Sequence, residues 1–133
     1  MKTITYKTNE SITAEQFSKV FRASGIRRPV DDLPRLQKML EHSDLLITAW
    51  DREQLVGVAR SITDFSYCCY LSDLAVDQNY QSHGIGKELV RQTQQQINEE
   101  VALILLSSPI AMEFYPRIGF QKVENGYIIP RLR

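Results

Sequence analysis

LSDLAVDQNYQSHGIGK, the sequence from Leu71 to Lys87, carries the most information about fold and function. Its first residues are typical of a strand, and its two glycines, Gly84 and Gly86, open an amphipathic helix. Small residues let a backbone approach an anion closely, and the free N–H groups of a helix N-terminus attract negative charge. Lys87 adds a positive charge in the first turn. The segment therefore predicts a strand–loop–helix unit that binds phosphate.

Two common phosphate loops are excluded by residue identity. A P-loop ending at Gly86 and Lys87 requires glycine at position 81 and serine or threonine at position 88, and the chain has Gln81 and Glu88 there. A dinucleotide fingerprint that begins at the first loop glycine requires a third glycine where Leu89 stands. The phosphate must therefore be held by another kind of loop.

The rest of the chain predicts a mixed α/β sheet with helices on both faces. Strands are expected at Thr3–Lys7, Leu45–Trp50, Leu55–Ile62, Tyr67–Val76, Val101–Leu106, Phe120–Val123 and Tyr127–Ile129, and helices after Thr13, from about Asp32, from Gly84 and around Ile110–Ile118. The continuous apolar run Val101–Leu106 indicates a central strand buried on both faces, and Asn125-Gly126 indicates a hairpin turn. No linker or repeat interrupts residues 1–133, so we expect one domain.

Composition limits the classes of partner. The hydrophobic share is 43%, the charged share is 24%, and 16 basic residues balance 16 acidic ones. This balance favours neither nucleic acid nor a membrane as the partner. The N-terminus lacks the apolar core of a signal peptide, and Cys68 and Cys69 are adjacent, which disfavours a disulfide between them. We therefore expect a cytoplasmic protein.

Two blocks of sequence together resemble the GNAT superfamily of N-acetyltransferases. Gln81 to Gly86 matches its Gln/Arg-x-x-Gly-x-Gly/Ala signature, directly after a strand that ends Leu-Ala-Val. Phe114 to Phe120 is similar to its Leu-Tyr-x-x-x-Gly-Phe block, at a compatible separation. The resemblance implies a GNAT-type fold: a mixed, largely antiparallel twisted sheet with helices on both faces and a splayed central strand pair. It also implies acetyl-CoA as cosubstrate, with no metal.

The resemblance further implies which residues hold the coenzyme. In the family, the strand before the loop carries a bulge and diverges from the next strand, so that its unpaired backbone groups bind the pantetheine arm. The residues at these positions, together with those whose backbone N–H groups face the pyrophosphate, are Leu74, Ala75, Val76, Gln81, Ser82, His83, Gly84, Ile85, Gly86 and Lys87. Ser108 stands where several relatives have an asparagine that contacts the coenzyme, which puts that contact in doubt.

Tyr115 occupies the position of the family's general acid, which protonates the departing thiolate. The base is open: the chain has Tyr70 and Leu103 where some members have glutamate, and Asp73, another residue or water are the alternatives. An aspartate such as Asp73 more often orders a loop or pairs with an arginine. Four arginines cluster between the first two helices, which border the acceptor site in related proteins; they are Arg22, Arg27, Arg28 and Arg35. They could favour an acidic acceptor. We interpret them as a solvated face, with Asp31 and Asp32 nearby. His42 and His83 have no partners at metal-binding spacing.

These features predict an N-acetyltransferase that transfers acetyl from acetyl-CoA to a primary amine of a small molecule or peptide in a ternary complex. The acceptor is not encoded in any recognisable pattern. Two alternatives are a non-catalytic acyl-CoA-binding module of the same fold and an unrelated α/β interaction domain. The family also implies a homodimer, with the hairpin Phe120–Ile129 as its contact.

Overall fold

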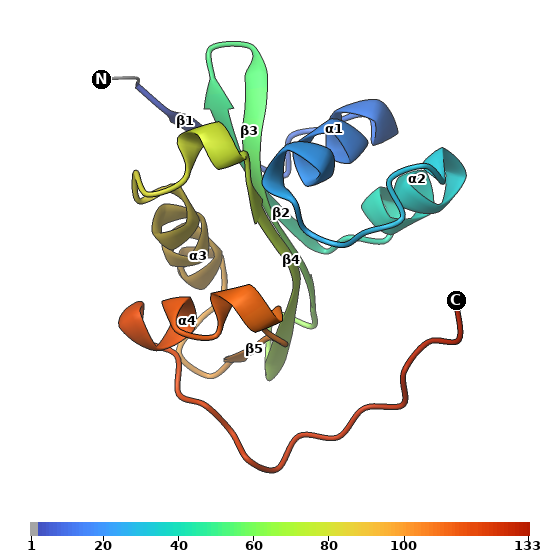
Figure 1. The fold of residues 1–133 in the computed structure, drawn as a ribbon. Helices are drawn as coiled ribbons and strands as arrows, with labels where there is room; N and C mark the ends of the chain where they lie inside the picture. Colours follow the sequence, from blue (N-terminus) through green and yellow to red (C-terminus); the bar gives the residue numbers. More distant parts are fainter. Residues whose placement is uncertain (1–2) are drawn as a thin grey trace.

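A five-stranded sheet runs through the molecule with its strands in sequence order, β1-β2-β3-β4-β5 (Figure 1). The computed structural model describes residues 3–133. The strands are β1 (Thr5–Thr8), β2 (Leu45–Asp51), β3 (Gln54–Thr63), β4 (Cys68–Val76) and β5 (Ala102–Ile104). Neighbouring strands from β1 to β4 pair antiparallel, and β5 pairs parallel with β4. The predicted mixed, largely antiparallel sheet is confirmed.

Helices cover both faces of this sheet (Figure 1). They are α1 (Ala14–Ser24), α2 (Leu33–Glu41), α3 (Ile85–Gln96) and α4 (Phe114–Arg117), with 3₁₀ turns η1 (Gln78–Tyr80) and η2 (Pro109–Ala111). The expected capping box forms at Thr13, and Gly25 ends α1 in the left-handed conformation with φ of 80°. Local sequence signals therefore decide where α1 begins and ends.

Each face of the sheet has its own apolar core. Phe17 and Phe21 of α1 are fully buried in one cluster, which also contains Ala75 of β4. Leu89 of α3 is buried in the other cluster, which contains Leu71 of β4. Leu71 and Ala75 lie four residues apart on β4 but on opposite faces, and this requires an irregularity in the strand.

That irregularity is a bulge at Ser72. The register between β3 and β4 shifts between Asp73 and Leu71, which leaves Ser72 as the extra residue. In a regular strand the odd-numbered residues share one face. The bulge moves Leu71 and Ala75 to opposite faces and brings Asp73 to the side of α1 and α2.

Two arginines hold the bulge in place through Asp73, which is only 1% exposed. Arg28, in the connection between α1 and α2, donates from Nε to Asp73 Oδ1 at 2.5 Å and from Nη2 to the Ser72 carbonyl at 2.9 Å. Arg60 of β3 donates from Nε to the other carboxylate oxygen of Asp73 and from Nη2 to Ser72 Oγ. This Arg28–Asp73–Arg60 cluster ties α1, β3 and β4 together.

The structure contradicts the predicted C-terminal hairpin. Phe120–Val123 and Tyr127–Ile129 form no strand, and all of residues 121–133 are exposed (Figure 1). Asn125-Gly126 has the turn chemistry of a hairpin, but a two-stranded hairpin needs a surface to pack on. Because these residues pair with no strand of the described sheet, the turn signal alone does not form the hairpin.

The prediction for Val101–Leu106 is also wrong in part. The paired segment is only Ala102–Ile104, it forms the edge of the sheet, and Ile104 is 51% exposed. The strand β5 is short because β4 diverges from it after Tyr70, close to the bulge. It is an edge strand because no described residues pair with its outer side.

We predict that Asp73→Ala lowers the free energy of unfolding by about 3–5 kcal/mol, because it leaves Arg60 buried without a counter-charge. Asp31→Ala is the matched control, since Asp31 pairs with Arg22 at side-chain exposures of 90% and 55% and should cost at most about 1 kcal/mol. Urea unfolding of the three proteins measures both values. Equal losses in the two variants would contradict a structural role for the Arg28–Asp73–Arg60 cluster.

Candidate coenzyme and acyl-transfer site

The end of β4 presents backbone groups toward the side of the sheet where β5 lies. Asp77 N–H donates to the Val56 carbonyl at 2.8 Å, so this pair carries ladder hydrogen bonds. In an antiparallel ladder such pairs alternate with pairs whose backbone groups point outward. With the observed register, the outward-pointing residues of β4 are therefore Leu74 and Val76. The backbone groups of Ala75 face β3, and its side chain is buried at 2% exposure.

No strand of residues 3–133 pairs with these outward groups. β5 pairs with β4 only through Cys68, Cys69 and Tyr70, so the two strands separate before Leu74. This is the splayed pair that the sequence predicted, although β5 lies at the edge of the sheet and not at its centre. The Val76 carbonyl accepts from Gln81 Nε2 at 2.9 Å, which leaves the Val76 N–H and both backbone groups of Leu74 facing the gap.

The predicted phosphate loop lies directly beyond this strand end. Ser82 and Gly84 have φ of 67° and 79°, and this left-handed backbone turns the chain into α3. Gly84 suits its position because a φ of 79° strains residues that carry a side chain. It makes no side-chain cap, so the first N–H groups of α3 are left without one. Nothing lies within 4 Å of a Cβ built on Gly84, so this helix N-terminus is open to a ligand.

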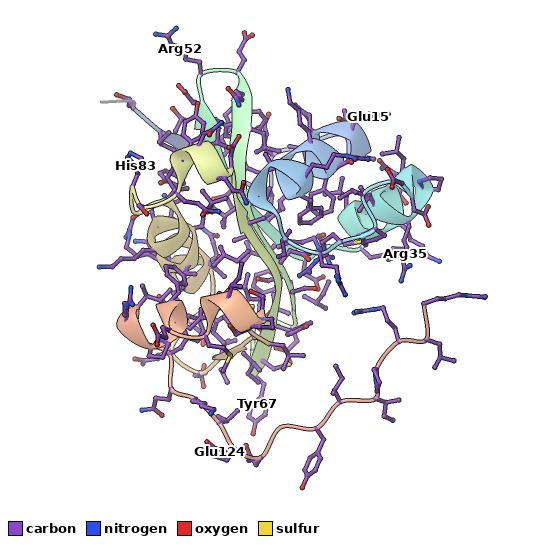
Figure 2. All side chains as sticks on the ribbon, in the orientation of Figure 1. Glu15, Arg35, Arg52, Tyr67, His83 and Glu124 are labelled. Carbon is purple, nitrogen blue, oxygen red and sulfur yellow. The ribbon has the colours of Figure 1, made fainter. Side chains whose placement is uncertain are left out.

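The side chains of the loop take different positions. Gln81, Ser82, His83 and Lys87 are exposed, and Figure 2 shows His83 pointing outward. The His83 ring nitrogen Nδ1 lies 2.8 Å from the Gln81 carbonyl, which anchors the ring to the loop. Ile85 is 3% exposed and packs in the α3 core, so only its backbone can contact a ligand.

Gly86 lies where the Gln81–Gly86 block contacts the Phe114–Phe120 block. A Cβ at this position would lie 3.3 Å from Phe114 Cζ and 3.8 Å from Val76 Cγ2. The missing side chain therefore lets the first turn of α3 pack closely against both α4 and the end of β4. Through Phe114 this contact places Tyr115 beside the strand–loop–helix unit, with ring centroids of the two aromatic residues 5.2 Å apart.

Tyr115 is half-buried between Phe114 and Phe120, whose ring meets it edge-on at 5.5 Å. Burial raises the pKa of the Tyr115 phenol above its ordinary value, and the Arg28 guanidinium partly opposes this rise. The phenol is therefore protonated throughout the neutral pH range. The Tyr115 hydroxyl makes no hydrogen bond within residues 3–133. Ser61 Oγ is the one side-chain oxygen of these residues that is both fully buried and without a partner, so the Tyr115 hydroxyl is accessible to solvent.

Asp73, the one carboxylate considered as a base, is occupied. Its two oxygens accept hydrogen bonds from Arg28 and Arg60, and this geometry does not favour proton uptake from an acceptor. Tyr70 stands at 40% exposure where some family members carry glutamate. Ser108 is exposed in the segment between β5 and η2.

Sequence reasoning missed the part that Arg28 and Arg60 play. Arg28 was assigned to a solvated face with Arg22, Arg27 and Arg35, but it pairs with a residue 45 positions away. Two signals could have found the cluster. An aspartate in a strand, such as Asp73, commonly pairs with an arginine, and a charged residue within the apolar run of β3, such as Arg60, is buried at a cost unless it has a partner.

Among residues 3–133 no group of three histidine, cysteine, aspartate or glutamate side chains is placed to hold a metal ion. None of the helices formed by these residues combines the length and the apolar character needed to cross a membrane.

Comparison with known proteins identifies the family. A family model described as an acetyltransferase (GNAT) domain matches residues 8–128. An uncharacterized N-acetyltransferase ycf52 of Pyropia yezoensis is 26% identical over 94% of this chain and 74% of its own length. GCN5-related N-acetyltransferase 1, chloroplastic, of Arabidopsis thaliana is 27% identical over 90% of this chain, which spans 62% of that relative.

A solved structure shows the same fold over the whole chain. An acetyltransferase of the GNAT family from Streptococcus pneumoniae TIGR4 superposes with a TM-score of 0.79 and 25% identity, covering 98% of this chain and 100% of its own. The strand bulge, the open helix N-terminus and the neighbouring tyrosine therefore occur in a chain that matches the family over nearly its full length. The protein belongs to the GNAT acetyltransferase family.

Proposed function

We propose that this chain is an acetyl-CoA-dependent N-acetyltransferase that acts on a primary amine of a small molecule or peptide, in a ternary complex. One observation carries the proposal: Gly86 packs against both Val76 and Phe114, which puts the outward-facing end of β4, the free N-terminus of α3 and Tyr115 in one place. A thioester cosubstrate needs these three features together: an extended binding edge, an anion site and an acid.

The residues fit the coenzyme in two ways. Leu74 and Val76 offer outward backbone groups that bind the amide-containing pantetheine arm as a strand would. The N–H groups of Gln81–Lys87 at the start of α3 bind the pyrophosphate, and Lys87 adds a positive charge. Acetyl-CoA supplies an acetyl group activated as a thioester. The role of Ala75 is to pack the strand in place through its side chain.

The Tyr115 phenol supplies a proton. As the amine nitrogen bonds to the acetyl carbon and the carbon–sulfur bond breaks, the phenol donates its proton to the departing sulfur. The raised pKa keeps this proton in place until the sulfur becomes basic. The phenolate then recovers a proton from solvent.

Water takes the proton that the amine releases. Asp73 is unsuited to this role because Arg28 and Arg60 occupy both of its oxygens. These two guanidinium groups outnumber the single carboxylate, so the cluster carries one net positive charge. A positive charge near the acceptor favours the neutral, nucleophilic form of its amine over the ammonium form.

We also propose a cytoplasmic homodimer, without nucleic acid or membrane as partner, in keeping with the balanced charge of the chain. A non-catalytic acyl-CoA-binding module is the alternative function, because the glutamate that some family members carry is replaced at Tyr70 and Leu103. Turnover on a panel of polyamines, aminoglycosides, amino acids, arylalkylamines and peptides separates an enzyme from a binding module.

Acetyl-CoA should stabilise the fold. At ~100 times its dissociation constant, a ligand bound only by the native state adds about 2.7 kcal/mol, or roughly 10 °C in a thermal melt. Gly84→Val should lose most of this shift, because a branched residue strains the left-handed backbone that opens α3. Gly126→Val should keep it, since Gly126 lies in open space far along the chain from the loop.

Circular dichroism of both glycine variants checks that they fold. The proposal fails if wild-type protein shows no shift with millimolar acetyl-CoA. An equal shift in folded Gly84→Val would remove the loop from the site.

Tyr115→Phe should lower kcat by about 10²–10⁴-fold when chemistry limits the rate, because general acids contribute amounts of this order. The aromatic contacts with Phe114 and Phe120 remain, so KM for acetyl-CoA should change little. Tyr127→Phe is the matched control, since Tyr127 is fully exposed and should keep wild-type turnover. Steady-state kinetics across pH, on the best acceptor of the panel, measure these values.

The wild-type profile should show no loss of this acid on the basic side until pH passes the ordinary tyrosine pKa of about 10, because burial raises the pKa of Tyr115. Full turnover of Tyr115→Phe at every pH, with chemistry shown to limit the rate, would make Tyr115 a packing residue.

A further inference from the structure

Arg28 keeps part of its hydrogen-bonding capacity unused. An arginine guanidinium carries five N–H donors, one on Nε and two on each Nη. Three of them are occupied: Nε donates to Asp73 Oδ1, Nη1 to the Arg27 carbonyl at 2.7 Å and Nη2 to the Ser72 carbonyl at 2.9 Å. The other two, one on each Nη, make no hydrogen bond within residues 3–133, and the side chain is 27% exposed. Arg28 can therefore still bind an oxygen ligand from solvent.

Arg28 also carries the positive charge that Asp73 leaves uncompensated, because this one carboxylate is shared by two guanidinium groups. The second guanidinium, that of Arg60, is 8% exposed and donates inside the protein to the Met39 carbonyl at 3.2 Å and to Ser72 Oγ at 3.2 Å. The more exposed Arg28 therefore presents the excess charge to solvent. A carboxylate is the ligand that suits it, since a guanidinium binds a carboxylate through two parallel hydrogen bonds.

This cation lies at the strand edge where we propose that the coenzyme binds. The Ser72 carbonyl that accepts from Arg28 belongs to the β4 bulge, two residues before Leu74, whose outward backbone groups face the gap. Burial raises the pKa of the Tyr115 phenol, and the Arg28 guanidinium lies near enough to oppose this rise. A carboxylate bound to Arg28 is therefore held beside the coenzyme edge and near the proposed proton donor.

A half-exposed apolar pair continues the same face of the sheet. Arg60 and Ile62 lie on one face of β3, because alternate residues of a strand share a face. Ile62 pairs across the strands with Tyr70, and the two side chains are 41% and 40% exposed. Two residues along a strand correspond to roughly 7 Å, a distance that a large amino-acid side chain can bridge. The face therefore offers a cation and, next to it, an apolar surface.

We propose that the acceptor is a free α-amino acid with an aromatic or large apolar side chain. Its carboxylate binds the two remaining N–H groups of Arg28, and its side chain packs on Ile62 and Tyr70. Its amine nitrogen bonds to the acetyl carbon as the carbon–sulfur bond breaks; the sulfur takes the Tyr115 proton, and water takes the proton that the nitrogen releases. The products are an N-acetyl amino acid and coenzyme A. This inference rests on the proposed acetyltransferase function and names the acceptor class of that site.

The charge of Arg28 also suits an amino acid chemically. The carboxylate of a free amino acid stabilises the neighbouring ammonium group, and an ammonium group cannot attack a carbonyl. Pairing with Arg28 offsets this negative charge, so that more of the bound amine is in its neutral form. Acceptors with several positive charges, such as polyamines and aminoglycosides, gain no hydrogen bond from the guanidinium and are repelled by it. The site therefore favours a zwitterion over a polycation.

Matched acceptors test the carboxylate contact in the wild-type protein. L-phenylalanine, L-phenylalanine amide and phenylethylamine share the ring and the primary amine, and only the first carries a carboxylate. At equal concentrations of unprotonated amine, kcat/KM should be at least about tenfold higher for phenylalanine than for the other two, because hydrogen bonds between charged groups contribute this much. L-alanine should be roughly tenfold poorer than phenylalanine, since it lacks the side chain that packs on Tyr70.

Arg28→Gln should remove most of the preference for phenylalanine over phenylethylamine. Asp73 keeps Arg60 as its partner in this variant. Arg52→Gln is the matched control of charge, because Arg52 is exposed in the turn between β2 and β3, at the end of the molecule opposite to Tyr67 (Figure 2). It should keep the wild-type preference. Circular dichroism and the thermal shift with acetyl-CoA verify that both variants fold and bind the coenzyme.

Tyr70→Ser should remove most of the preference for phenylalanine over alanine, because the ring of the acceptor loses part of its apolar contact. Tyr67→Ser is the matched control: Tyr67 is 78% exposed in the turn between β3 and β4, and this variant should keep the preference.

Equal kcat/KM values for phenylalanine, its amide and phenylethylamine in the wild type overturn the proposal and leave the acetyltransferase function intact. Higher values for polyamines or aminoglycosides than for phenylalanine also overturn it, as does a folded Arg28→Gln variant that keeps the wild-type preference. If that variant does not fold, the wild-type comparison alone decides. A protein that binds acetyl-CoA and acetylates none of these acceptors overturns this inference, whereas one that binds no acetyl-CoA contradicts the proposed function itself.

Discussion

The buried carboxylate of Asp73 lies between two arginines, and the rest of the site depends on this contact. Arg28 and Arg60 reach it from different elements and also donate to the backbone and hydroxyl of Ser72. The cluster thereby stabilises the bulge in β4. Without the bulge, β4 could not contribute Leu71 to one core and Ala75 to the other while keeping its register with β3.

The bulge also affects the candidate site, because β4 separates from β5 on the C-terminal side of the bulge. The ladder with β3 continues to Asp77, so Leu74 and Val76 point their backbone groups into the gap. Because Gly86 has no side chain, α3 can pack closely against Val76 and Phe114. A strand edge, a helix N-terminus and a tyrosine therefore meet through backbone geometry and one absent Cβ.

Much of this could be predicted from the sequence, where the determinants are local. The capping box at Thr13 and the glycine that ends α1 formed as expected, as did the loop that opens α3 at Gly84. The prediction of a C-terminal hairpin was wrong because its formation does not depend on local signals alone. Asn125-Gly126 favours a turn, but strands also need a neighbour to pair with. The short, exposed β5 has the same cause, because an apolar run specifies a strand without specifying how many partners it has.

The sequence by itself determined the order of most elements, the glycine loop that opens α3 and the position of Tyr115 in its block. The reason is that positive φ angles, caps and alternation act within a few residues. Only the tertiary structure decided that Arg28 belongs to Asp73, because these residues lie 45 positions apart and nothing local marks the pair. The same holds for the contact of Gly86 with Phe114 and for the open edge of β5. Contacts between distant segments depend on how the chain closes in space, and this is where the site acquires its buried charges.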